Sequence, residues 1–227
     1  MLDSKGPLLP QIWAANKSWD EYQAAIKPRK GAAQILPGHI DAFIRTSFPL
    51  HCYTLFLVTS FLLSCTLVPV TDLIFGAMAW PAAEYTLHRF ALHELPDRIK
   101  PGRLGQCLHF VVHGYHHMFP RDAGLLMWPY PVSLGVMAAS AALLACTGVA
   151  LGTAVGVCGG FWIGQAVYDV MHFFIHCQPM QADFPALKRW LDPQIRHHTN
   201  HHHASGPASQ RYGVSTTFVD DMLSKNE

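Results

Sequence analysis

Long apolar blocks separated by polar segments dominate the pattern of this chain. A membrane-spanning helix needs about 20 apolar residues to cross roughly 30 Å of hydrocarbon. The apolar blocks lie at 48–70, 73–87 and 132–168. We therefore predict an all-α integral membrane protein with four transmembrane helices in two hairpins, at about 48–70, 73–87, 132–147 and 149–170. The second span is short and contains Pro81, and turns near 70 and 148 close the hairpins.

The basic residues give these spans an orientation. Of 16 Lys and Arg residues, six lie in 1–47, five in 88–131 and five in 177–227, and neither hairpin turn contains one. The positive-inside rule then places both termini and the 88–131 segment on the cytoplasmic side. The alternative, a soluble protein with four buried core helices, leaves the charge-free turns unexplained.

Composition agrees with a membrane protein and narrows its partners. Half of the residues are hydrophobic and 14% are charged, against about a quarter charged in typical soluble domains. The formal net charge of +1 gives no electrostatic basis for binding nucleic acid.

The domain organisation follows from the same pattern. We expect a cytosolic or interfacial segment over 1–47 and a membrane-embedded domain over 48–227. Ser18 followed by Glu21 is typical of a capping box that starts a helix. Tryptophans beside lysines in the first segment suit a membrane surface, although an ordinary soluble arm has the same composition.

One apolar block carries a regular series of small residues. Gly152, Gly156, Gly160 and Gly164 recur every four residues. Small residues at this spacing let a neighbouring helix approach closely within a bilayer. The same helical ridge continues to His172 and His176, so we expect this packing edge to lead to the histidines described next.

Histidine is the main candidate for chemistry. The chain contains 15 histidines, and ten of them fall into four stretches on the predicted cytoplasmic side. The candidate metal ligands are His88 and His93; His113, His116 and His117; His172 and His176; and His198, His201 and His202. We predict that a cytosolic helical cap gathers these four stretches.

Spacing predicts how the rings are arranged within each stretch. Positions i, i+3 and i+4 share one helical face, so His113, His116 and His117 together suggest half of a metal site. The 198/201/202 stretch repeats that spacing, and 172/176 matches a helical chelating pair. His88 and His93 are five residues apart, so we expect them off a common helical face, with His88 ending its helix and His93 in the bend before Pro96.

The number of rings suggests two ions. One ion accepts about four to six donors, and imidazole favours zinc, iron, copper or nickel over magnesium or calcium. Six neighbouring residues are candidates to orient an imidazole or line the substrate path: His109, Asp169, Glu84, Tyr168, His197 and Tyr212. The two carboxylates could equally cap helix ends, and the two tyrosines could equally be interfacial aromatics.

The motifs resemble those of the fatty acid hydroxylase/sterol desaturase superfamily, and most closely its fatty acid 2-hydroxylase branch. The matching residues are Tyr85-x-x-His88-Arg-Phe-x-x-His93, His109-Phe-x-x-His113-Gly-x-His116-His117, Tyr168-Asp-x-x-His172-x-x-x-His176, and His198-x-x-His201-His202 followed by Tyr212-Gly-x-Ser-Thr216. The loops Pro120-x-Asp122 and Pro129-x-Pro131 also fit. The resemblance covers about 75–220 and leaves 1–47 outside.

The resemblance implies a dinuclear metal centre at the cytosolic membrane surface. It also implies O₂-dependent hydroxylation at C2 of a fatty acid or of the acyl chain of a sphingolipid. Zinc has no redox chemistry, so we expect iron in the working enzyme, although zinc binds nitrogen sites more tightly and can occupy purified protein.

Two further expectations concern partners and alternatives. Eukaryotic members often carry a fused cytochrome b5 domain, for which we find no segment here, so the resemblance implies a separate electron donor of the cytochrome b5, ferredoxin or reductase type. The alternatives are a carotenoid or sterol oxidase of the same superfamily, or a metal-binding or transport protein of the membrane.

Overall fold

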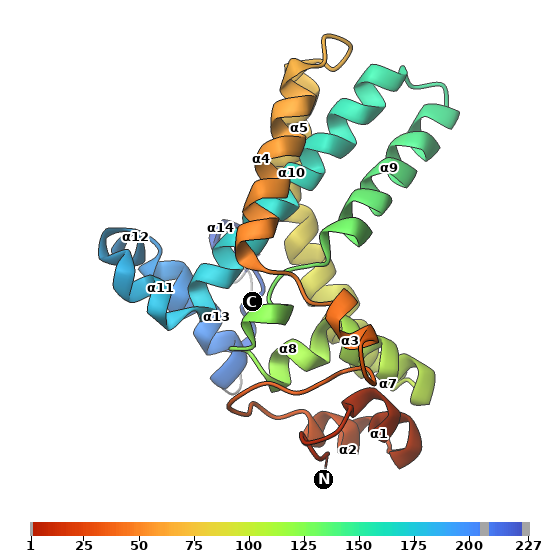
Figure 1. The fold of residues 1–227 in the computed structure, drawn as a ribbon, viewed down its shortest axis with the longest axis vertical. Helices are drawn as coiled ribbons and strands as arrows, with labels where there is room; N and C mark the ends of the chain where they lie inside the picture. The colour runs from red at the N-terminus through yellow and green to blue at the C-terminus, as the bar shows by residue number, and fades with distance from the viewer. Residues whose placement is uncertain (1, 205–208, 224–227) are drawn as a thin grey trace.

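Four long helices stand on a cap of short ones (Figure 1). In the computed structural model, which describes residues 2–204 and 209–223, these residues form helices and no strand. The long helices are α4 (Phe48–Ser64), α5 (Val70–Thr86), α9 (Tyr130–Cys146) and α10 (Leu151–His176). Each overlaps one predicted span, but α4 ends six residues before 70 and α10 continues six residues beyond 170.

The cap is built from short helices that lie before, between and after the long helices along the chain. Before α4 lie α1 (Leu8–Ala15), α2 (Trp19–Ala25) and α3 (Ile40–Phe43). After α5 come the π-helix η1 (Leu87–Glu94), α6 (Leu95–Ile99), α7 (Arg103–His109), the π-helix η2 (Phe110–Gly114), α8 (Tyr115–Met118) and the 3₁₀-helix η3 (Ala123–Leu125). After α10 come α11 (Gln178–Asp183), α12 (Pro185–Trp190), α13 (Asp192–His203) and α14 (Phe218–Leu223).

The glycine series of α10 packs against α5, as predicted. A Cβ atom added at Gly156 would lie 2.8 Å from Asp72 Cβ, and one at Gly164 would lie 2.5 Å from Trp80 Cβ. At Gly160 it would collide with the Leu73 carbonyl. The two backbones are therefore as close as glycine allows. This contact fixes the C-terminal end of α10, which carries His172 and His176, relative to the C-terminal end of α5.

The number of membrane spans is supported less fully than the number of long helices. Among the described residues, length and composition qualify one segment, Ala123–Cys146, as a candidate span, and only 6% of its most apolar window is buried. Phe48–Ser64 is also apolar but has 17 residues, which is the lower limit of the length that a membrane-spanning helix needs.

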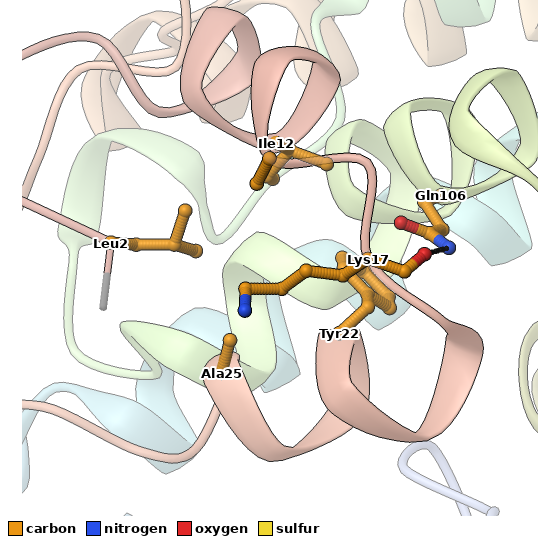
Figure 2. A pocket seen from close by; sticks show the side chains of 7 residues that line it. Leu2, Ile12, Lys17, Tyr22, Ala25 and Gln106 are labelled. Carbon is orange, nitrogen blue, oxygen red and sulfur yellow. Dashed lines mark hydrogen bonds between the residues drawn. The ribbon is translucent and has the colours of Figure 1, made fainter.

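The first 47 residues form an arm that packs onto the cap. Ser18 and Glu21 form the predicted capping box at the start of α2. Tyr22 and Phe110 are buried in one apolar cluster shared by the arm and the α7–α8 region. Gln106 of α7 donates from Nε2 to the Lys17 carbonyl at 2.9 Å (Figure 2). The arm is therefore part of the support of the helix that carries the central histidines.

The chain between 87 and 99 corrects one prediction. We expected the helix to end at His88 and a bend at His93, but the helix continues through η1 and α6 to Ile99. The Leu95 N–H donates to the Phe90 carbonyl, five residues back. In this wider helix, positions i and i+5 lie on the same side, so His88 and His93 face the same way and their ring centroids are 5.1 Å apart.

Candidate metal centre

All ten predicted histidines come together in two groups of five. The first group consists of His88, His93, His113, His117 and His201, and the second group of His116, His172, His176, His198 and His202. Within each group, one ring nitrogen per residue lies within 4.8 Å of all the others. The groups adjoin, because the ring centroids of His117 and His202 are 4.6 Å apart.

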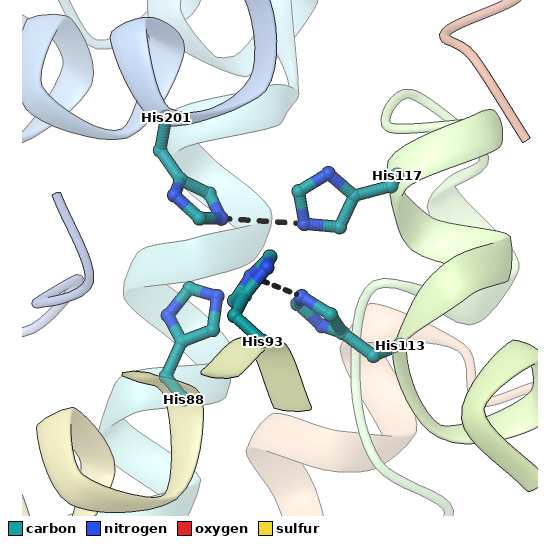
Figure 3. A group of neighbouring side chains, drawn as sticks. All are labelled: His88, His93, His113, His117 and His201. Carbon is teal, nitrogen blue, oxygen red and sulfur yellow. Dashed lines mark hydrogen bonds between the residues drawn. The ribbon is translucent and has the colours of Figure 1, made fainter. Parts of the chain in front are cut away.

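Three separate stretches of the chain build the first group (Figure 3). His88 and His93 come from η1, His113 from η2, His117 from α8 and His201 from α13. Their rings point toward a common centre (Figure 3). The Nε2 atoms of His93 and His113 are 2.9 Å apart, and those of His117 and His201 are 3.2 Å apart.

Regular α-helices build most of the second group. His172 and His176 are i and i+4 on α10, His198 and His202 are i and i+4 on α13, and α8 adds His116. The Nε2 atom of His172 is 3.0 Å from both His116 Nε2 and His198 Nε2.

The two HxxHH stretches divide between the groups, which corrects the expectation that each forms half of one site. In the 113–117 stretch, the i and i+4 histidines join the first group and His116 joins the second. In the 198–202 stretch, the i and i+4 histidines join the second group and His201 joins the first. Neighbouring side chains on a helix are about 100° apart, so adjacent histidines face different centres. Each helix thereby ties both groups together.

Backbone carbonyls fix the orientation of three of the rings. His88 Nδ1 is 2.7 Å from the Tyr212 carbonyl, His172 Nδ1 is 3.1 Å from that of Leu126, and His201 Nδ1 is 3.0 Å from that of Ser209. A carbonyl only accepts, so each Nδ1 carries the hydrogen. In the neutral ring, the Nε2 lone pair then points into the group, as in metal-bound histidines.

The separations between the ring nitrogens suit imidazoles that share a metal ion. Nitrogen ligands about 2.1 Å from an ion and at right angles to each other are roughly 3.0 Å apart, which matches the separations of 2.9–3.2 Å. The Nε2 atoms of His88 and His176 are buried and have no hydrogen-bond partner among the described residues. Five imidazoles and no carboxylate per group suit zinc, iron, copper or nickel.

Burial keeps the histidines in the form that binds metal. Removal from water lowers the pKa of His88 to about 4 and that of His117 to about 3. Burial, followed by the neighbouring imidazoles, lowers the pKa of His113 and His198 well below the usual range. These rings are neutral at pH 7, and a neutral imidazole can offer a lone pair to a cation.

Two carboxylates hold the loop that orients His88. Glu84 accepts from the backbone N–H groups of Val214 and Ser215 and from the Ser215 hydroxyl. Asp220 accepts from the Tyr212 N–H at 2.8 Å. Glu84, a candidate to orient an imidazole, is connected to His88 through this loop, whose Tyr212 carbonyl accepts from His88 Nδ1.

Asp169 and Tyr168 lie beside the second group. Asp169 is fully buried, accepts from Gln165 Nε2 at 2.5 Å and lies 3.7 Å from His51 Nε2. Among the described residues, its side-chain partners are thus not imidazoles of the second group. Tyr168 stacks on His172 with ring centroids 5.4 Å apart.

The other three predicted neighbours have distinct surroundings. His197 Nε2 lies 3.2 Å from Asp220. The Tyr212 ring contacts His93 and His201 at centroid distances of 5.4 and 5.5 Å. It borders a polar cleft of about 500 Å³ that reaches the first group. His109 is in neither group and contacts Tyr22 and the Leu92 carbonyl.

Sequence reasoning did not find every residue that supports the site. Asp220, Tyr22 and the carbonyls of Leu126 and Ser209 were not among the candidates. Carbonyl partners have no sequence signal because every residue has one. Tyr22 lies 87 residues before His109, and no local spacing connects them.

The comparisons with known proteins show the family of this chain and its fold. The sequence model of the family described as fatty acid hydroxylase matches residues 73–225. The chain therefore belongs to the fatty acid hydroxylase family. A solved structure titled "Full length scs7p (only hydroxylase domain visible)" has the same fold, with a TM-score of 0.73, 24% identity, and coverage of 99% of this chain and 84% of that one.

Two curated relatives place the chain within that family. The ceramide very long chain fatty acid hydroxylase scs7 of Schizosaccharomyces pombe is 30% identical over 98% of this chain and 64% of its own length. The dihydroceramide fatty acyl 2-hydroxylase FAH2 of Arabidopsis thaliana is 29% identical over 77% of this chain and 68% of its own. The first similarity includes the N-terminal arm, which we had expected to lie outside the resemblance.

Proposed function

We propose that this chain is a membrane-bound, O₂-dependent hydroxylase that places a hydroxyl group on C2 of a fatty acid or of the acyl chain of a sphingolipid. The observation that carries the proposal is the pair of adjoining five-histidine groups in a chain of the fatty acid hydroxylase family. The names of the relatives, which are ceramide and dihydroceramide acyl hydroxylases, support the substrate class.

The ten histidines would hold two iron ions, five ligands to each. Iron supplies the redox chemistry that O₂ activation and attack on an unactivated C–H bond require, and zinc does not. The residues of the chain orient and protect this centre. The carbonyls of Tyr212, Leu126 and Ser209 hold three Nδ1–H groups, and burial excludes water. Tyr168 and Tyr212 would line the path of the acyl chain.

The overall reaction defines a further partner. One oxygen atom of O₂ enters the C–H bond and the other leaves as water, which consumes two electrons and two protons. A separate reducing protein of the cytochrome b5, ferredoxin or reductase class would supply these electrons.

We propose the membrane placement that the charges predict. The four long helices would span the bilayer, with the cap, both termini and the metal centre on the cytoplasmic side. Large apolar side chains such as Phe56 of α4 and Leu143 of α9 are 65% and 73% exposed. Lipid would cover such side chains in a membrane.

Lipid analysis of a host without a 2-hydroxylase of its own tests the proposal. Expression of the wild-type chain should produce 2-hydroxy acyl chains, detected by mass spectrometry after acid hydrolysis. The matched variant His113→Ala should produce none. New oxygenated carotenoids or sterols without 2-hydroxy acyl chains would contradict the assigned substrate.

Metal replacement tests the iron part separately. Purified protein is stripped with a chelator and reloaded with iron or with zinc, and each form receives a chemical reductant and O₂. Only the iron form should hydroxylate. Full activity of a sample free of iron would refute the di-iron assignment while leaving the substrate assignment intact.

A further inference from the structure

The N-terminal arm reaches the first group through one buried pair of side chains, Tyr22 and His109. The Tyr22 hydroxyl is 2.8 Å from His109 Nδ1, and His109 Nε2 is 3.2 Å from the Leu92 carbonyl. Tyr22 is 2% exposed and His109 is 9% exposed. Neither residue belongs to a five-histidine group, so the metal centre alone does not account for this arrangement.

The direction of both hydrogen bonds follows from the carbonyl. The Leu92 oxygen can only accept, so His109 Nε2 carries the hydrogen and donates it. The neutral ring then has its lone pair on Nδ1, and the Tyr22 hydroxyl must donate to it. The two contacts thus select a single tautomer and a single ring orientation for His109.

The Leu92 carbonyl, four residues before a proline, accepts from a side chain. In an α-helix, the N–H of residue 96 would donate to this carbonyl, but residue 96 is proline and has no N–H. His109 Nε2 donates to the Leu92 carbonyl from outside the helix. Leu92 lies in η1 between His88 and His93, so this bond acts on the segment that carries both ligands.

Two further contacts bring the N-terminal arm close to the helices on either side of this pair. The Trp19 indole donates from Nε1 to Asp97 at 2.9 Å and links the arm to α6. A Cβ atom added at Gly114 would lie 2.6 Å from the Tyr22 hydroxyl and 3.1 Å from His109 Nδ1. Only glycine lets η2 pass this close to the pair.

We infer that Tyr22 and His109 are positioning residues of the first group: the arm, acting through His109, holds η1 in the π-helical register that turns His88 and His93 toward one ion. This inference rests on the proposed function for the identity of the bound ions. In the second group, the α-helical register of α10 and α13 itself aligns the two i, i+4 pairs.

Metal affinity of the full chain in detergent tests the inference without an activity assay. Zinc is titrated in competition with a chromophoric chelator, and the wild-type chain should bind two ions. Removal of partners behind metal ligands typically costs about 10- to 100-fold in affinity. Tyr22→Phe and His109→Leu should each lower the affinity for one of the two ions by that factor. His109→Gln keeps an N–H donor for Leu92 and should recover part of the loss.

Two ligand variants identify which ion is affected. His176→Ala leaves the first group as the intact site, and His93→Ala leaves the second. Adding Tyr22→Phe should lower the affinity for the remaining ion in the His176→Ala background. In the His93→Ala background it should leave that affinity unchanged.

Tyr115→Phe is the matched control. Its hydroxyl is equally buried in the same apolar cluster but binds Ala33 and Asp122, so both zinc affinities should stay at the wild-type level. The inference is wrong if Tyr22→Phe leaves both zinc affinities unchanged, or if it lowers both affinities by the same factor. A wild-type chain that binds fewer than two ions would overturn the proposed function, and this inference with it.

Discussion

The two histidine groups use the same ligands but obtain them from different kinds of backbone. The second group takes two i, i+4 pairs from uninterrupted α-helices, α10 and α13. The first group takes its 88/93 pair from a π-helix and His113 from another. Regular helix geometry therefore aligns one group, while the other depends on contacts made by distant segments.

This contrast explains where the supporting side chains lie. The π-helix is rare and occurs mostly as short segments, often at functional sites. Around η1, the structure places Pro96, His109, the N-terminal arm and the loop held by Glu84. The second group has a carbonyl behind His172 and the stacked ring of Tyr168. Sensitivity to distant substitutions should therefore be greater for the first group.

Ligand removal should have the largest effect, and the effect should be the same whichever group loses the ligand. His113→Ala in the first group and His172→Ala in the second should each abolish 2-hydroxylation, because the proposed chemistry uses two ions. Each variant should also lose about one ion per chain, measured by elemental analysis of purified protein. A ligand variant with normal activity and two bound ions would contradict the assignment of that group.

Glu84→Gln should lower the metal affinity of the first group but not that of the second, with an effect smaller than that of ligand removal. Gln keeps the size but weakens the bonds from Val214 and Ser215, which hold the loop behind His88. We expect about a 10- to 100-fold loss of affinity for one ion. The matched variant Asp169→Asn alters a buried carboxylate beside the second group and should spare the first ion. Equal loss of both ions in Glu84→Gln would show that the loop does not act on one group.

Gly160→Ala tests whether helix packing holds the groups in register. The added methyl would collide with the Leu73 carbonyl, and overpacking of this kind costs about 1–3 kcal/mol. Thermal unfolding in detergent should show a lower midpoint. Gly135→Ala is the control, because a Cβ at that position of α9 meets nothing within 4 Å. A drop of similar size in both variants would argue against the close α5–α10 contact.

Lys100→Ala should have the smallest effect. Lys100 pairs with Asp20 of the arm at 3.0 Å, and both side chains are more than half exposed. Exposed ion pairs contribute about 0–1 kcal/mol, so the unfolding midpoint and both metal affinities should stay near wild type. A selective loss of the first ion would mean that surface charge, and not the buried Tyr22–His109 pair, couples the arm to the site.

Much of the architecture could be read from local patterns. The apolar blocks predicted the four long helices, and the glycine series predicted the close packing of α10 because small side chains at every fourth position form a continuous ridge. Ser18 and Glu21 predicted the start of α2 because a capping box involves only neighbouring backbone. Each of these features depends on residues within a few turns of one another.

The π-helix at His88 and His93 could not be predicted in this way. Five-residue spacing argues against a shared face in an α-helix, and we predicted a bend on that ground. Pro96 is present in the sequence, but its consequence depends on His109, 17 residues beyond Leu92. The donor that reaches the Leu92 carbonyl comes from α7, and only tertiary structure places it there.

The sequence by itself determined which ten histidines could act and that they exceed the needs of one ion. Tertiary structure alone decided how they divide, with His116 and His201 each crossing to the group opposite its helical neighbours. The physical reason is that spacing along a helix fixes only the angle between side chains. The centre that each side chain faces depends on where the other helices lie.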